Sequence, residues 1–227
     1  MELSLAGRAR MHAALGEPVR LAIVHRLALT DRSPSDLAQA LDLPTNLLSH
    51  HLGVLEGAGL VLRSRSAGDK RRTYVRLAHA DRFVASLVPM PRVAKHRRVL
   101  FVCTHNSARS QMAAAAWRKV SDLPAESAGT HPAARVHPRA VAVGRRHGLN
   151  LSGAATRHVQ DILEPGDLVV AVCDQVHEEL DGTDARLHWS VPDPSTLNKN
   201  EAFESALQQL TTRINRLAPA FVPAGAA

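Results

Sequence analysis

Long hydrophobic runs, cysteines and aromatic residues are all scarce in this chain of 227 residues. No run of about 18 apolar residues occurs, which excludes a membrane-spanning helix and makes a membrane partner unexpected. The first residues, Met1–Met11, lack a continuous apolar core and a small-residue cleavage site, so we do not expect export. These absences predict a cytoplasmic protein.

Only two cysteines are present, Cys103 and Cys173. In a reducing cytoplasm, their number alone indicates no more than two buried apolar thiols. Aromatic residues make up 3% of the chain, and Tyr74 is its one tyrosine. The hydrophobic and charged fractions, 45% and 22%, are ordinary for a globular protein and exclude disorder.

Positive charge is concentrated in the first part of the chain. Residues 1–95 carry 14 Lys and Arg against 8 Asp and Glu, a net of +6, whereas residues 96–227 carry 14 against 13, a net of +1. A polyanion partner such as DNA favours this asymmetry, because each neutralised phosphate releases counterions. The alternative is a basic surface that is merely solvated.

Two prolines spaced by one residue, within Val88–Arg92, discourage helix and divide the chain. We therefore predict an N-terminal domain of residues 1–88, a linker of residues 89–96 and a C-terminal domain of residues 97–222. The tail that starts at Val222 is predicted to be frayed. No internal repeat is visible.

The first domain has the pattern of a winged helix-turn-helix. Apolar periodicity predicts a helix over Val19–Leu29, and Ser33–Leu41 reads as a second helix with proline near its first position. Thr45 is expected to cap a third helix that runs through Leu55. Alternating segments, residues 60–65 and 72–77, flank a glycine-containing turn and predict a β-hairpin, which forms the wing.

The last of these helices is the expected reader of the DNA major groove, and the wing is the expected contact with phosphates or the minor groove. Leu48, Leu52 and Leu55 share one face and are expected to pack inward. The predicted DNA contacts are Thr45, Asn46, Ser49 and His50 on the helix and Arg63, Arg65, Lys70, Arg71 and Arg72 on the wing.

Leu15–Leu21 and Ser49–Leu55, in register with the wing, resemble the ArsR-type family of winged-helix repressors over about residues 10–80. The resemblance implies a homodimer, formed through this domain, that binds a double-stranded DNA operator and releases it when a metal or metalloid binds. The sequence departs from the family because Ser35–Leu41 lacks the cysteine pair of many sensing sites. His50 and His51 are adjacent on a helix and point about 100° apart, so we predict no metal site there.

Strands and helices alternate in the second domain, which predicts an α/β fold with a four-stranded parallel sheet covered on both faces. The expected strands are 99–102, 125–128 and 168–172, and the expected helices are 110–120, 137–147 and 198–217.

The segment Cys103–Ser110 carries the chemistry. Cys103 ends a buried strand, a short loop follows, and a helix begins at Ser110. Loop N–H groups backed by a helix N-terminus form a positive nest for a tetrahedral oxyanion. Arg109 adds a forked donor, and the same field favours the nucleophilic thiolate of Cys103. The predicted oxyanion-binding residues are Thr104, His105, Asn106, Ser107, Ala108, Arg109 and Ser110.

Val99–Trp117, Ser127–Thr130 and Asp193-Pro194 resemble the low-molecular-weight protein tyrosine phosphatase superfamily over about residues 97–217. The resemblance implies that Asp193 is the general acid that protonates the leaving group. The phosphatases usually follow this Asp-Pro with aromatic residues that hold a phosphotyrosine ring, and here Ser195–Leu197 has none.

A small inorganic oxyanion needs no such aromatic wall. Cys103–Met112, Val172–Asp174 and His188–Pro194 resemble the thiol-linked arsenate reductases, which implies reduction of arsenate to arsenite with no tightly bound cofactor. Cys173 ends the second buried strand, where neighbouring strand ends face one crevice, so it can approach Cys103. The alternative is that Cys173 is a small apolar residue filling the strand end.

The chain also departs from this family. Asp174–Asp181 lacks the further cysteine of many relatives, and Ala108 stands where some have cysteine. Two routes stay open: thioredoxin reduces a Cys103–Cys173 disulfide, or a small thiol such as mycothiol or glutathione attacks the arsenate adduct directly.

The sequence therefore favours a thiol-dependent arsenate reductase fused to a DNA-binding transcriptional regulator, with Cys103, Arg109, Asp193 and Cys173 as the catalytic set. Two alternatives stay open. One is a phosphatase, and the other is a repressor whose C-terminal domain only senses an oxyanion or the redox state.

Overall fold

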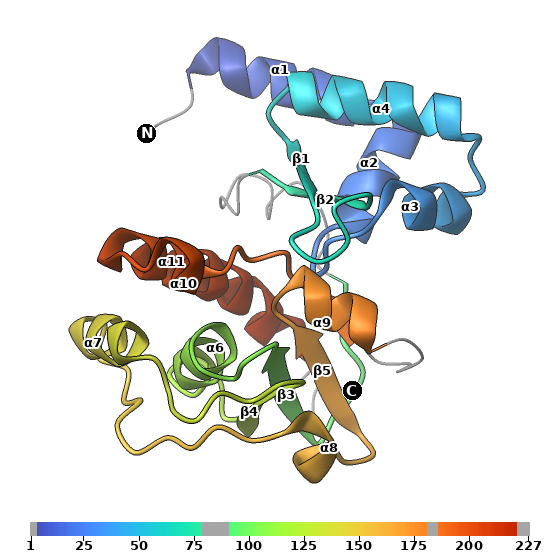
Figure 1. The fold of residues 1–227 in the computed structure, drawn as a ribbon. Coiled ribbons are helices and arrows are strands. Elements are labelled where there is room, and N and C mark those ends of the chain that lie inside the picture. The colour runs from blue at the N-terminus through green and yellow to red at the C-terminus, as the bar shows by residue number, and fades with distance from the viewer. Residues whose placement is uncertain (1–3, 79–90, 181–185, 222–227) are drawn as a thin grey trace. The chain divides into compact units, whose positions relative to one another are not determined.

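The computed structural model describes residues 4–78, 91–180 and 186–221. The chain forms two compact units, Met1–Ser66 with Lys70–Pro91 and Arg92–Ala227 with Ala67–Asp69 (Figure 1). Residues 89–90 of the predicted linker and the predicted frayed tail, residues 222–227, lie outside the described residues. In the part described, no helix is both long enough and apolar enough to span a membrane.

The described part of the first unit has four helices, of which all but α1 were expected from the sequence. They are α1 (Leu5–Leu15), α2 (Pro18–Arg26), α3 (Pro34–Leu41) and α4 (Thr45–Gly57). The side chains of Ser4, Glu17 and Ser33 accept hydrogen bonds from backbone N–H groups at the starts of α1, α2 and α3. Ser33 forms a reciprocal capping box with Asp36, which fixes the start of α3.

The start of α4 corrects one prediction. Pro44 is the N-cap, Thr45 is already the first helical residue, and no side chain caps this helix. The predicted inward face is confirmed, because Leu48, Leu52 and Leu55 are fully buried in the core that α4 shares with the other helices. Helix α4 therefore turns its opposite, polar face to solvent.

The predicted wing is present as an antiparallel hairpin of β1 (Val61–Arg65) and β2 (Thr73–Leu77). Val61 pairs with Leu77, and both side chains are buried in the core of this unit. Arg32 adds a short antiparallel bridge to Val75, with N–H to carbonyl bonds of 3.1 and 2.8 Å. The bridge ties the segment before α3 to the hairpin.

Gly53 lies in the middle of α4, exposed, and an added Cβ would meet no atom within 4 Å. Because glycine costs backbone entropy in a helix interior, we expect Gly53→Ala to raise the free energy of unfolding by about 0.5–1 kcal/mol. Urea unfolding followed by circular dichroism measures this change. Gly59, with φ +72°, is the matched control: Gly59→Ala should destabilise the same unit. If both substitutions changed the free energy of unfolding alike, or if Gly53→Ala destabilised the unit and Gly59→Ala stabilised it, this explanation would be wrong.

The second unit is built on a sheet of four parallel strands, which confirms the predicted fold class. The strands are β3 (Arg98–Cys103), β4 (Ala125–Gly129), β5 (Asp167–Ala171) and β6 (Arg186–His188), in the order β4-β3-β5-β6. The central strands β3 and β5 are buried almost throughout, as continuous apolar runs require. Strand β6 was not located from the sequence.

Helices surround this sheet in the second unit (Figure 1). They are α6 (Arg109–Trp117), α7 (Pro138–Arg146), α8 (Val159–Ile162), α9 (Asp174–Glu179), α10 (Pro194–Leu197) and α11 (Asn200–Leu217), followed by a 3-10 turn, Ala218–Ala220. Helix α6 packs on β3 and β4, and α11 packs on α6 and α7. Asn198, with φ 46°, ends α10, so α11 begins two residues later than predicted.

Part of the predicted linker belongs to this unit. The backbone N–H of Val93 donates to the carbonyl of Ala220 at 2.9 Å, and the ring of His96 lies against Phe221. The segment that enters β3 is therefore held against the end of α11 and its 3-10 turn.

The strand order places a topological switch point at the carboxyl end of the sheet. The chain leaves β3, forms β4 on one side of it, and later returns to form β5 on its other side. At such a switch point the loops that follow the two central strands diverge, which is where ligands bind in open α/β sheets. Cys103 is the last residue of β3, and Cys173 lies two residues beyond β5, so both cysteines follow the strands of this switch point.

Candidate active site

The loop between β3 and α6 is held by a neighbouring segment, residues 131–137. Three carbonyls of the loop accept hydrogen bonds from this segment. The bonds run from His131 N to Thr104 O (2.8 Å), from Ala133 N to His105 O (2.9 Å) and from His137 N to Ser107 O (2.8 Å). Because these carbonyls are engaged by the 131–137 segment, they do not compete with the loop N–H groups, which an anion nest requires to be available.

Asn106 sets the direction of the hydrogen bond to the sulfur of Cys103. The backbone N–H of Arg157 donates to Asn106 Oδ1 at 2.8 Å, so the amide nitrogen of Asn106 faces the other way and donates to Ser110 Oγ at 2.9 Å. The hydroxyl of Ser110 keeps one proton, which is free to be donated to Cys103 Sγ, 3.1 Å away. Asn106 itself has φ 48°, a left-handed conformation that asparagine tolerates.

Arg109, the first residue of α6, is 4% exposed and directs its fork toward the loop that carries Asp193. Its Nη1 donates to the carbonyl of Val191 at 3.0 Å and its Nη2 to Asp193 Oδ2 at 2.6 Å. Burial opposes the charge of Arg109, but the sulfurs of Cys173 and Cys103 and the carboxylate of Asp193 together raise its pKa. Arg109 is therefore a permanent positive charge beside both sulfurs.

Asp193 is held in its ionised form. Burial would raise the pKa of this carboxyl, but the charge of Arg109 and the hydrogen bonds from Ser195 lower it. The backbone N–H and hydroxyl of Ser195 both donate to Asp193 Oδ1, at 2.9 and 2.6 Å. A general acid must carry a proton, so this arrangement has to change before Asp193 can protonate a leaving group. An oxyanion that attracts Arg109 would produce such a change.

Cys173 is a free, buried cysteine like Cys103. Its sulfur lies 3.6 Å from the hydroxyl of Thr104, the residue that follows Cys103. Burial raises the pKa of Cys173, although the charge of Arg109 opposes the shift. The second cysteine therefore stays a thiol under conditions in which an exposed cysteine would begin to ionise.

The predicted oxyanion-binding residues all lie in this loop or at the start of α6, and they differ in how far they are exposed to solvent. Thr104, Asn106, Ala108, Arg109 and Ser110 are buried, whereas Ser107 is half-buried and His105 is exposed. Three contributions were missed from the sequence: the 131–137 segment, the carbonyl of Val191 and the hydroxyl of Ser195. The first two act through backbone atoms, which leave no signature in residue type.

His137 joins the 131–137 segment to α7 and provides a pH-dependent contact. Its backbone N–H binds the loop, its Nδ1 accepts from Arg139 N at 3.2 Å, and burial together with the charges of Arg139 and Arg135 lowers its pKa. Below the ordinary histidine value of about 6.5 the unfolded chain takes up a proton that the folded protein resists, so stability falls with pH until the lowered pKa is reached.

We expect His137→Asn to remove part of this acid sensitivity, because asparagine caps a helix without titrating. Unfolding free energies of both proteins, measured between about pH 7.5 and about pH 5, provide the test. The difference in free energy of unfolding between the parent and the variant should shrink as the pH falls. The other histidines are common to both proteins, so their contributions cancel in this difference. A constant difference would refute the role of His137.

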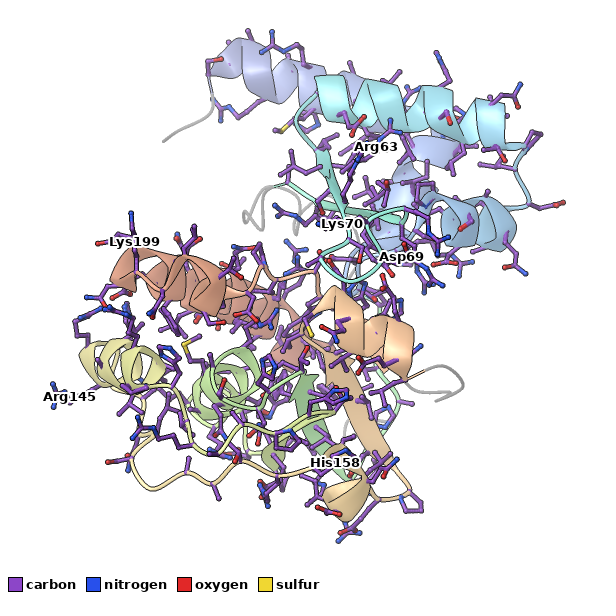
Figure 2. The ribbon with its side chains drawn as sticks, in the orientation of Figure 1. Arg63, Asp69, Lys70, Arg145, His158 and Lys199 are labelled. Atoms are coloured by element: carbon purple, nitrogen blue, oxygen red, sulfur yellow. The ribbon has the colours of Figure 1, made fainter. Side chains whose placement is uncertain are left out.

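The predicted DNA contacts lie on the exposed surface of the first unit. Thr45, Asn46, Ser49 and His50 are exposed on α4, and Arg65, Lys70, Arg71 and Arg72 are exposed on the hairpin. Arg63 has another role in this structure: its fork binds both carboxylate oxygens of Glu56, at 2.8 and 2.6 Å, and joins β1 to α4. Figure 2 labels Arg63 on β1 and Lys70 at the turn of the hairpin.

Comparison with known proteins identifies both parts of the chain. Residues 98–223 match the family described as Low molecular weight phosphotyrosine protein phosphatase, and residues 15–64 match a helix-turn-helix domain. An arsenate reductase of Brevibacillus brevis is 31% identical over 128 residues, which cover 54% of this chain and 94% of that protein. The HTH-type transcriptional repressor SmtB of Mycobacterium tuberculosis is 41% identical over 75 residues, 33% of this chain and 52% of the repressor.

This chain thus spans about half the length of that repressor. Among solved structures, the arsenate reductase of Archaeoglobus fulgidus has 30% sequence identity and a TM-score of 0.47, covering 54% of this chain and 99% of that one. The chain therefore belongs to the low molecular weight phosphotyrosine protein phosphatase family, and ahead of that domain in the sequence it carries a helix-turn-helix domain that is similar to part of the SmtB repressor.

Proposed function

We propose that the C-terminal domain reduces arsenate to arsenite, with Cys103 as the nucleophile. The observation that carries the proposal is the loop Cys103–Arg109, where carbonyls bound by residues 131–137, the hydroxyl of Ser110 at 3.1 Å from the sulfur and a buried guanidinium accompany one cysteine. A tetrahedral oxyanion fits such a nest. The absence of an aromatic residue from Ser195–Leu197, directly after Pro194, and the arsenate reductase relative favour arsenate over a phosphotyrosine ester.

In the first step the sulfur of Cys103 bonds to arsenic, and one arsenate oxygen leaves as water after it gains a proton. Arg109 moves from Asp193 to two oxygens of the bound anion, because a divalent oxyanion matches its fork. This exchange removes the charge that keeps Asp193 ionised, so Asp193 can then carry the proton to the leaving oxygen.

In the second step another thiol attacks the sulfur of Cys103. A disulfide forms, the sulfur–arsenic bond breaks, and its electron pair stays on arsenic, so As(V) becomes As(III) and two thiols are oxidised. Cys173 is the proposed second thiol because its sulfur adjoins the loop through Thr104. The resulting disulfide would need reduction by a thioredoxin-type protein, whereas mycothiol or glutathione could replace Cys173 in the attack.

Arsenate-dependent consumption of reductant tests the proposal, with thioredoxin, glutathione and mycothiol supplied in turn. The parent should turn over and Cys103→Ser should not. If Cys173→Ser abolishes only the thioredoxin-driven reaction, the disulfide route holds; if it turns over fully with a small thiol, that thiol attacks the adduct. Hydrolysis of p-nitrophenyl phosphate without arsenate reduction would assign the domain as a phosphatase.

We further propose that the first domain binds an operator as a homodimer, with the domain boundaries predicted above. The exposed polar face of α4 and the basic hairpin support this proposal. Fluorescence anisotropy with duplex DNA, repeated at several salt concentrations, tests it. Asn46→Ala should weaken binding to the preferred site by about 1–3 kcal/mol, whereas Lys70→Ala should weaken all sequences alike and reduce the salt slope by about one.

Operator binding that responds to arsenate or to an oxidant, without turnover, would favour a sensor in place of an enzyme.

A further inference from the structure

Two hydroxyl groups adjoin the two sulfurs of the candidate site, and they differ in their other hydrogen-bond partners. At Cys103 the hydroxyl of Ser110 accepts from Asn106 and keeps its proton for the sulfur. At Cys173 the hydroxyl is that of Thr104, 3.6 Å from the sulfur. The direction of the Thr104 proton depends on the other hydrogen-bond partners of this hydroxyl.

Gln175 is such a partner. Its amide nitrogen donates to Glu179 Oε1 at 2.8 Å, and a carboxylate oxygen can only accept, so the amide orientation is fixed. The amide oxygen of Gln175 consequently faces Thr104, whose hydroxyl donates to it across 3.5 Å. Thr104 has one proton, for which Gln175 and the sulfur of Cys173 therefore compete, and a hydrogen bond from Thr104 to that sulfur lowers the pKa of Cys173. The share of the proton that Gln175 takes weakens the hydrogen bond to Cys173.

The position of Glu179 is supported from two sides. It lies four residues after Gln175 on α9, a spacing that brings helical side chains together. Its second oxygen is 3.8 Å from the imidazole of His131, whose backbone N–H binds the carbonyl of Thr104. Thr104, Gln175, Glu179 and His131 therefore form a closed ring beside Cys173.

We propose that Gln175 and Glu179 are positioning residues that draw the proton of the Thr104 hydroxyl away from Cys173, so that this cysteine rests as a thiol while Cys103 acts as the nucleophile. The inference rests on the proposed function, because it assigns an order to the two sulfurs of that reaction. Two anionic sulfurs beside Arg109 would repel an oxyanion, and a resting thiol avoids this.

The pKa of Cys173 also responds to the charge of Arg109 from α6, to Cys103 from β3 and to a hydrogen bond from the backbone N–H of Val176. None of these involves the side chain of Gln175, so the effect of its amide can be isolated. During attack on the sulfur of Cys103, the proton of Cys173 leaves with the departing arsenite oxygen, while the disulfide forms and the arsenic gains the electron pair. Atoms and charge balance without a further reactant.

The test needs no arsenate. Cys103→Ser leaves Cys173 as the chain's one sulfhydryl, so the ultraviolet absorbance of its thiolate can be titrated alone. In that background Gln175→Ala should move the titration midpoint to lower pH, because the freed Thr104 hydroxyl can rotate and donate to the sulfur. Gln208→Ala, the same change at an exposed position of α11, should leave the midpoint in place.

Glu179→Gln tests the same idea at the outer end of the ring. Because Glu179 is exposed, this variant should fold even if Gln175→Ala does not. It should also lower the midpoint, since the amide of Gln175 loses the anion that orients it. A midpoint that is unchanged or raised in these variants overturns the proposal. Failure of arsenate reduction would not affect this readout, so the two hypotheses fail separately.

Discussion

Arg109→Lys should reduce arsenate turnover by about 10²–10³-fold while leaving the fold intact. Lysine keeps the positive charge, but it replaces a planar fork with a single ammonium that cannot bind two oxygens of one anion. Arg109 also binds the carbonyl of Val191 and the carboxylate of Asp193 in the free protein, and lysine cannot reach both with the same geometry. The loss therefore combines weaker anion binding with a displaced Asp193.

Two measurements separate these losses. Steady-state kinetics give the rate of arsenate reduction, and the degree to which bound sulfate protects Cys103 against an alkylating reagent gives the strength of anion binding. Arg145→Lys is the matched control, because Arg145 is exposed on α7 and points away from the unit (Figure 2). The control should retain parental turnover. If Arg109→Lys kept the protection by sulfate and most of the turnover, charge alone would suffice and the fork would have no special role.

The sequence predicted the main elements of both domains because their signals are local. Continuous apolar runs marked β3 and β5, and the cap at Ser33 marked α3. Helix α1 was missed since two of its four buried residues, Gly7 and Ala14, are small and give little hydrophobic contrast. Strand β6 has three residues and no apolar run, so only its pairing with β5 defines it.

The candidate site could be predicted only where residue type carries the chemistry. Cys103 and Arg109 stood out because their spacing fits a loop between a strand and a helix. The carbonyl of Val191 and the N–H groups of residues 131–137 could not be found, since any residue except proline supplies the same N–H. The pairing of Arg109 with Asp193 was also unexpected, and it makes the general-acid role depend on a bound anion. The catalytic assignments stay predictions until they are assayed.

Gly129→Ala should have an effect of similar size at a position that bears no functional group. Gly129 ends β4 beside Cys103, and a Cβ added there would lie 2.7 Å from the carbonyl oxygen of Thr104 and 2.8 Å from the backbone nitrogen of Asn106. Both atoms are backbone, so the anion loop itself must move. A shift of about 1 Å at reacting groups can cost about 10²-fold in rate, and overpacking costs about 1–3 kcal/mol of stability.

Arsenate turnover and urea unfolding of Gly129→Ala measure the two losses, with Gly53→Ala as the control that applies the same chemical change where no atom is near. The control should be slightly more stable than the parent and equally active in the reductase assay. A Gly129→Ala protein that kept full turnover would mean that the loop can yield without losing its nest. The close approach of β4 would then be a packing feature, and the geometry of the loop would not depend on it.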